Sequence, residues 1–115
     1  MYRIAIASSN GENVDLHFAQ AASFLIYEIT KDGVDFIDDR PVVLPEKEHV
    51  HNEENMDAVI ELLNDCVAVF VLKIGMRSSR QLYARGLKSF EVSYPLHHIF
   101  RTLVDNLQRG KIKVL

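Results

Sequence analysis

Short, almost purely apolar runs separate longer polar or amphipathic segments along this chain of 115 residues. The apolar runs are rich in Ile, Val, Ala and Phe, which is typical of strands buried inside a sheet. The turn signal Lys31-Asp32-Gly33 separates one such run from a more polar strand, whose Pro41 suits the edge of a sheet. Five strands are therefore predicted, at residues 2–7, 23–29, 34–43, 67–72 and 89–92.

Three helices are predicted from apolar side chains that recur every three or four residues. Asn52 is a candidate N-cap of the first helix, and Ser78 is expected to cap the second. Gly86 suits the end of the second helix, while Pro95 suits the first turn of the third and Gly110 its end. The helices are expected over residues 53–63, 78–85 and 95–107.

The order of these elements, β-β-β-α-β-α-β-α, predicts the α/β class. Strands that are reached through a helix pair in parallel by right-handed crossovers, whereas the hairpin makes the second strand antiparallel. The two most apolar strands, at 2–7 and 67–72, belong together at the centre of the sheet. We therefore predict a mixed five-stranded sheet in the order 3-2-1-4-5, with strand 2 antiparallel and helices on both faces. This resembles the three-layer ribonuclease-H-like architecture.

The composition fits one domain over residues 1–115, with a core at about 3–107 and a tail at 108–115. Hydrophobic residues make up 48% and charged residues 25%, so one core can form without disulfide bonds. The net charge of −3 gives no electrostatic reason to expect nucleic acid as a partner. A single cysteine, no signal-peptide pattern and no apolar stretch of membrane-spanning length predict a cytoplasmic protein with no membrane partner.

The longest predicted loop, 8–22, follows the first strand and is rich in turn-forming residues. A second loop, 73–79, follows the strand at 67–72. Because the two strands are predicted to be parallel neighbours, both loops leave the same edge of the sheet, where ligands bind in open α/β sheets. The second loop also ends at a helix N-terminus, whose N–H groups and dipole favour an anion.

The side chains on these two loops combine an imidazole, hydroxyl and amide groups, and positive charge. Such a pocket suits an anionic guest that offers imidazole a metal or a hydrogen-bond partner. Solvated His17, Gly75 as a simple turn residue and Ser78 as a simple cap are the structural alternatives. The candidate binding residues are His17, Ser8, Asn10, Gly75, Arg77 and Ser78, with His17 as the candidate metal ligand.

Other histidines and the cysteine are weaker candidates. His49 and His51 form a second candidate metal site, because side chains two residues apart point the same way in an extended segment. Two imidazoles leave that site incomplete, and a solvated acidic loop is the favoured alternative. His97 and His98 diverge by about 100° on a helix and do not readily chelate one ion. Cys66 is expected to be a buried small hydrophobic residue.

Support for catalysis is slight. The sequence has no Gly-rich phosphate loop, no Ser-His-Asp cue and no Cys-x-x-Cys pair. A two-metal nuclease needs grouped carboxylates, whereas the first strand, 2–7, contains no acidic residue. The chain is therefore predicted not to be an enzyme, and a metal-dependent hydrolase is the least favoured hypothesis.

Several short motifs follow one another over about residues 3–107. In the first half they are Arg3-Ile-Ala-Ile-Ala-Ser-Ser, Val14-Asp-Leu-His-Phe-Ala and Phe24-Leu-Ile-Tyr-Glu-Ile. In the second half they are Leu62-Leu-Asn-Asp-Cys-Val-Ala-Val-Phe-Val, Ile74-Gly, Leu82-Tyr-Ala-Arg-Gly-Leu and Phe90-Glu-Val. In this order and spacing they resemble the dinitrogenase iron-molybdenum cofactor biosynthesis family, the NifX-like domains.

The resemblance implies a ribonuclease-H-like domain that does no nuclease chemistry. It implies a non-enzymatic carrier that transiently binds an iron–sulfur or iron–molybdenum cluster, or a precursor, among cofactor-assembly proteins in nitrogen fixation. The histidine of the family's His-Phe-Gly motif maps onto His17, but Ala19 replaces the glycine, and Ala reaches positive φ at greater cost. The alternative is a regulatory or protein-interaction domain of the same fold that has lost the cluster and binds a protein or a small anion.

Overall fold

The computed structural model of the chain describes residues 1–43 and 53–110. Every predicted strand and helix is present, with ends that are shifted by a few residues. The elements are β1 (Tyr2–Ile6), the 3₁₀ helix η1 (Phe18–Gln20), β2 (Ser23–Thr30), β3 (Gly33–Pro41), α1 (Glu53–Leu62), β4 (Cys66–Val71), α2 (Met76–Ala84), β5 (Lys88–Glu91) and α3 (Leu96–Gln108).

The strands form one mixed sheet in the order β3-β2-β1-β4-β5. β1 is antiparallel to β2 and parallel to β4, so that Ile6 lies between Leu25 on one side and Phe70 on the other. β3 is antiparallel to β2, and β5 is parallel to β4. The predicted α/β class, strand order and antiparallel second strand are therefore confirmed, while the ribonuclease-H-like assignment stays a prediction.

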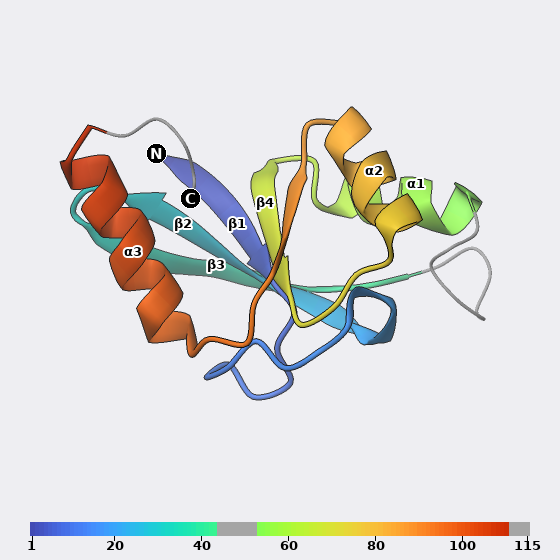
Figure 1. Cartoon of the computed structure of the whole chain (residues 1–115), viewed down its shortest axis with the longest axis horizontal. Helices are drawn as coiled ribbons and strands as arrows, with labels where there is room; N and C mark the ends of the chain where they lie inside the picture. The colour runs from blue at the N-terminus through green and yellow to red at the C-terminus, as the bar shows by residue number, and fades with distance from the viewer. Residues whose placement is uncertain (44–52, 111–115) are drawn as a thin grey trace.

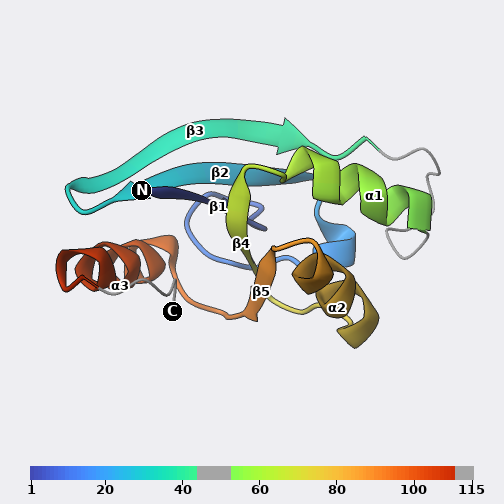
Figure 2. The same ribbon diagram turned by 90° about the horizontal axis from the view of Figure 1, so that it is seen from above.

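Helices cover both faces of the sheet and give the described chain three layers (Figures 1 and 2). On one face, Ala5 and Val69 belong to a buried cluster with side chains of α1 and α2. On the other face, Ile4 and Phe70 belong to a second cluster with side chains of α3. Because successive side chains of a strand point to opposite faces, β1 and β4 are buried on both, which explains their unbroken apolar runs.

Helix α2 begins two residues earlier than predicted. Its N-cap is Gly75, and the amide of Ser79 donates to the Gly75 carbonyl at 2.9 Å. Ser78 therefore lies within the first turn of the helix and is only 1% exposed, so its prediction as the cap is wrong. Ser78 is buried because it lies on the same face of the helix as buried Leu82. Gly86 follows the helix with a positive φ of 86°, as expected for a terminating glycine.

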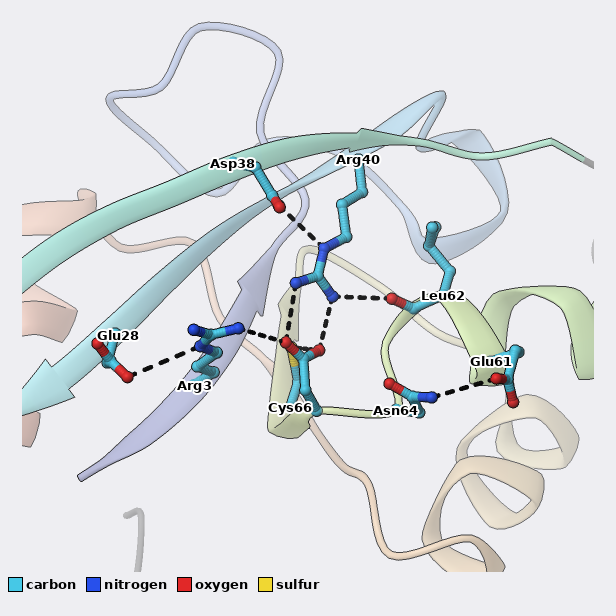
Figure 3. A network of polar contacts seen from close by, with 9 residues as sticks. Arg3, Glu28, Asp38, Arg40, Glu61, Leu62, Asn64 and Cys66 are labelled. Atoms are coloured by element: carbon cyan, nitrogen blue, oxygen red, sulfur yellow. Dashed lines mark hydrogen bonds and ion pairs between the residues drawn. The ribbon is translucent and has the colours of Figure 1, made fainter.

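A network of ion pairs braces the amino-terminal end of β4 (Figure 3). The guanidinium of Arg40 in β3 donates to both carboxylate oxygens of Asp65, at 2.6 and 2.8 Å, and to the Leu62 carbonyl at 2.9 Å. Arg3 in β1 donates to Asp65 at 2.8 Å. Charge-assisted bonds of this bidentate kind are the strong ones, so the turn between α1 and β4 is tied to two strands.

Candidate functional site

Loop 8–22 leaves the sheet at the end of β1 and then returns to it (Figure 1). The last contact of the departing chain is the Ala7 amide, which donates to the Phe70 carbonyl at 2.9 Å. Further along β4, the Leu72 amide donates to Leu16 at 2.9 Å, and the Phe18 amide donates to Lys73 at 2.8 Å. Residues 16–18 therefore occupy the place beside β4 that β1 has vacated, and they bring His17 next to the loop after β4.

A hollow of about 380 Å³ lies between these two segments. The aromatic ring of Phe18 anchors its floor, because this ring is 2% exposed and lies 5.9 Å from that of Phe24. His17, the preceding residue, is exposed at the rim. The lining residues are His17, Phe18, Ala19, Lys73, Ile74 and Gly75. The structure thus brings together His17 and Gly75 of the predicted set, and Lys73 lines the same hollow.

The electrostatics of the hollow favour a negatively charged guest. Lys73 lines it and is exposed, and Arg77 is exposed in the first turn of α2. Gly75 caps α2, and the N–H groups of a first helical turn have no partner within the helix and carry its positive dipole end. An anion in the hollow would therefore meet an ammonium group, an imidazole and a helix N-terminus together.

Glu91, at the end of β5, fixes the loop that forms one wall of the hollow. Its Oε2 accepts a hydrogen bond of 2.9 Å from the Ile74 amide. This bond holds 73–75 against β5 and occupies one of the carboxylate oxygens near the site. Sequence reasoning missed Glu91, because no local pattern indicates that a strand-terminal glutamate bonds an amide 17 residues away.

The structure does not place Ser8 and Asn10 in this hollow. Ser8 Oγ accepts from the Gly11 amide at 2.9 Å, and Asn10 Oδ1 accepts from the Glu12 amide at 2.8 Å. Short polar side chains are favoured in turns because they satisfy such amides. Both side chains therefore stabilise the turn in which they lie, and their predicted role as ligands has no geometric support here.

The same turn is closed by Ser9 and Asp15. The backbone amide of Ser9 donates to Asp15 Oδ1 at 2.8 Å, and its hydroxyl donates to Oδ2. These two bonds from Ser9 hold the pKa of the Asp15 carboxyl below its usual range. The carboxylate therefore stays charged, and both of its oxygens accept hydrogen bonds from Ser9 of the same loop.

The remaining predicted residues lie apart from the hollow. Arg77 does not line it, and Ser78 is buried in α2. His49 and His51 lie outside the described residues. His97 and His98 are exposed on α3, where the His98 ring lies 4.7 Å from that of Tyr94.

Cys66 lies at the opposite end of β4 and is 7% exposed, as predicted for a small hydrophobic residue. Burial raises the pKa of its thiol to about 12, so the thiol stays protonated at neutral pH. Among residues 1–43 and 53–110, no three His, Cys, Asp or Glu side chains are grouped as metal ligands. No helix within that part of the chain has both the length and the apolar character to cross a membrane.

Sequence comparisons connect the chain with proteins named NifX and NifB. It is 36% identical to the protein NifX of Azotobacter vinelandii over 81% of this chain and 58% of that one. It is 32% identical to the FeMo cofactor biosynthesis protein NifB of Klebsiella pneumoniae over 74% of this chain and 19% of that one. The chain therefore spans less than two thirds of the length of either relative.

Solved structures show the same fold. The crystal structure of PH0822 superposes with a TM-score of 0.59 at 19% identity, over 96% of this chain and 94% of that one. A crystal structure from Methanocaldococcus jannaschii gives a TM-score of 0.53 at 10% identity, over 96% and 91% of the two chains. The model of the dinitrogenase iron-molybdenum cofactor family matches residues 1–110. The resemblance seen in the motifs is thus confirmed, and the chain belongs to the dinitrogenase iron-molybdenum cofactor family.

Proposed function

We propose that this chain is a non-enzymatic carrier that transiently binds an iron–sulfur or iron–molybdenum cluster, or a precursor, in the assembly of a nitrogenase-type metallocofactor. The cargo would lie in the hollow between residues 16–19 and 73–75. Membership in the dinitrogenase iron-molybdenum cofactor family and the name of the NifB relative, a FeMo cofactor biosynthesis protein, support this cargo class. The partners would be the assembly proteins that deliver and receive the cluster.

One observation carries the placement of the cargo at His17. The hydrogen bond from the Phe18 amide to the Lys73 carbonyl pins the loop to the end of β4. Phe18 is buried, so the imidazole of the preceding residue is left at the rim of the hollow. A neutral imidazole is a common ligand of iron, and a cluster rich in sulfide is attracted to the positive charge of Lys73.

The donor set fits a cargo better than a resident metal. A stable metal site takes three or four protein ligands, whereas among the described residues His17 is the only imidazole or thiol group that lines this hollow. Cys66 supplies no thiolate, because its thiol is protonated and lies at the far end of β4. A cluster held by one imidazole would keep other ligands of its own, which suits uptake and release.

Anaerobic titration with a synthetic [4Fe–4S] cluster that carries ethanethiolate ligands tests the proposal, and isolated iron–molybdenum cofactor provides the second probe. Binding is followed by visible absorbance and by metal analysis after gel filtration. We expect His17→Ala to weaken binding by about tenfold or more, because the protein ligand is lost. His97→Ala is the matched control, since His97 is also an exposed histidine and lies on α3, and we expect it to bind as the wild type does.

Two results would contradict the proposal. Equal binding by wild type and His17→Ala would remove His17 from the role. Absence of binding to the wild-type chain would refute the carrier function itself.

The alternative is a regulatory or protein-interaction domain of the same fold that no longer binds a cluster. The single imidazole in the hollow and the engagement of Ser8 and Asn10 in their own turn favour it. The metal content of anaerobically purified protein separates the two functions. Stoichiometric iron supports the carrier, whereas a specific protein partner with substoichiometric metal supports the alternative.

A further inference from the structure

Strand β5 is the outermost strand on one side of the sheet, opposite β3 (Figure 2). Among residues 1–43 and 53–110 it is paired to β4 alone, and the Val92 amide continues that ladder by donating to Val71 at 2.9 Å. Amide and carbonyl groups alternate in direction along a strand. Since Val92 points toward β4, the backbone groups of Ser89 and Glu91 point outward from the sheet, where a further strand would bond to them.

The space beside this edge is hollowed on both faces of the sheet. On the face of α2, a hollow of about 510 Å³ is lined by residues of α2 and β5, among them Arg80, Tyr83 and Lys88. On the face of α3, a hollow of about 330 Å³ is lined by Val92 and Tyr94, among others. Side chains of an added strand would alternate between the two faces and would enter both hollows.

Apolar surface remains uncovered here. Tyr83 is 68% exposed and Tyr94 is 49% exposed. The Phe90 ring lies 5.2 Å from that of Phe70 and stays half-buried beside the cluster that α3 covers. Domains that bind peptides by strand addition use an exposed sheet edge for main-chain hydrogen bonds and pockets beside it for alternate side chains.

The charge at this edge is positive. Arg77, Arg80 and Lys88 are exposed, and none of the three forms an ion pair with a described residue. Glu91 adds one carboxylate at this edge, and its hydrogen bond with the neutral Ile74 amide does not cancel that charge. Arg80 and Lys88 both line the hollow between α2 and β5 and make it basic, although the whole chain has a net charge of −3.

We propose that β5 is a docking edge for an extended segment of a partner protein in which acidic and apolar side chains alternate. The segment adds a sixth strand to the sheet. Its acidic side chains pair with Arg80 and Lys88, which both line the hollow between α2 and β5, and its apolar side chains contact Phe90, Val92 and Tyr94. Main-chain hydrogen bonds hold the segment, and complementary charge selects it.

This docking edge lies next to the hollow of the proposed carrier function. Glu91 ends β5 and bonds the loop 73–75 that lines that hollow. A segment on β5 would therefore bring its protein to the cargo. This consequence rests on the proposed function. Docking itself needs no cargo and is measured without it, so the two proposals can fail separately.

The test uses the full chain and an eight-residue capped peptide that alternates Glu and Val, labelled for fluorescence anisotropy. The comparison peptide has Lys in place of Glu. We expect the acidic peptide to bind at least about tenfold more tightly than the basic one, because like charges repel at the groove. The double variant Arg80→Glu/Lys88→Glu should reverse this preference. Lys31→Glu/Arg101→Glu, with the same charge change at exposed positions elsewhere, should retain it.

Hydrogen exchange on the wild-type chain gives an independent readout that does not depend on any variant. The acidic peptide should slow exchange at the amides of Ser89 and Glu91 and leave the amides of β3 unchanged. Equal binding of the two peptides, or no protection at Ser89 and Glu91, would overturn the proposal.

Two other occupants of the edge would also overturn it. One is a second copy, shown by concentration-dependent dimers in sedimentation that Arg80→Glu/Lys88→Glu abolishes. The other is single-stranded RNA, shown by a twelve-nucleotide uridine oligomer that binds the same surface more tightly than the acidic peptide.

Discussion

The two ends of β4 are constructed in different ways. At the amino-terminal end, Asp65 accepts hydrogen bonds from Arg3 and Arg40, and opposite charges neutralise one another. At the carboxyl end, the contacts to loop 8–22 are made by backbone groups, and Lys73 and His17 remain exposed. Charged side chains at the amino-terminal end are bonded to one another, whereas Lys73 and His17 at the carboxyl end are exposed to solvent.

The amino-terminal end of β4 therefore contributes to stability, and the carboxyl end presents side chains for binding. Side chains that are held in a network lose their freedom, and changes to them disturb three elements at once. Backbone bonds hold residues 16–18 beside residues 72–73, and the side chains of His17 and Lys73 stay exposed. We therefore expect substitutions at the amino-terminal end to lower stability, and substitutions at the carboxyl end to alter binding with little effect on the fold.

The largest effect is expected for Asp65→Ala. It removes the acceptor of both guanidinium groups and should lower the free energy of unfolding by about 2 kcal/mol, measured by urea denaturation. The control is Asp105→Ala, which breaks the exposed pair between Asp105 and Arg109 on α3 and should cost no more than about 0.5 kcal/mol. Equal losses in the two variants would show that the network does not brace this end.

The acid side of the stability curve should report the same network. Hydrogen bonds from Arg40 hold the pKa of the Asp65 carboxyl well below its usual range, with Arg3 adding to the effect. A carboxyl whose folded pKa lies below the unfolded value of about 4 contributes stability that is present above pH 4 and is lost as pH falls toward the folded pKa.

We therefore expect the wild-type free energy of unfolding to decrease between pH 5 and pH 3, by about 1 kcal/mol more than in Asp65→Ala. Urea denaturation at fixed ionic strength over that pH range measures the difference. Curves for the two proteins that run parallel would mean that another group controls acid unfolding.

The smallest effect is expected for Ala19→Gly at the rim of the cargo hollow. No non-glycine residue among 1–43 and 53–110 has a positive φ, so Ala19 carries no strain that Gly would relieve. Glycine should instead lower the free energy of unfolding by about 0.5–1 kcal/mol, because it increases the entropy of the unfolded chain. Thermal and urea unfolding measure the change, and a more stable variant would contradict this account of the loop.

The site was predictable as far as it depended on strand order. Because apolar runs marked β1 and β4 and crossover handedness placed them side by side, His17 and Gly75 were expected at one edge of the sheet, where the structure has them. The positions of Ser8 and Asn10 were not predictable from that reasoning. A loop of such length can adopt many turns. In the turn that it adopts, the amides of Gly11 and Glu12 donate to the side chains of Ser8 and Asn10.

The sequence by itself determined the order of strands and helices, the hairpin at Asp32-Gly33 and the pairing of β1 with β4, because these follow from local periodicity, turn chemistry and handedness. Tertiary structure alone decided the rest. Asp65 meets Arg40 and Arg3 from 25 and 62 residues away, Glu91 reaches the amide of Ile74, and residues 16–18 return to β4. Each of these contacts joins groups that lie far apart in the chain, so no local pattern encodes them, and they form only when packing brings the groups together.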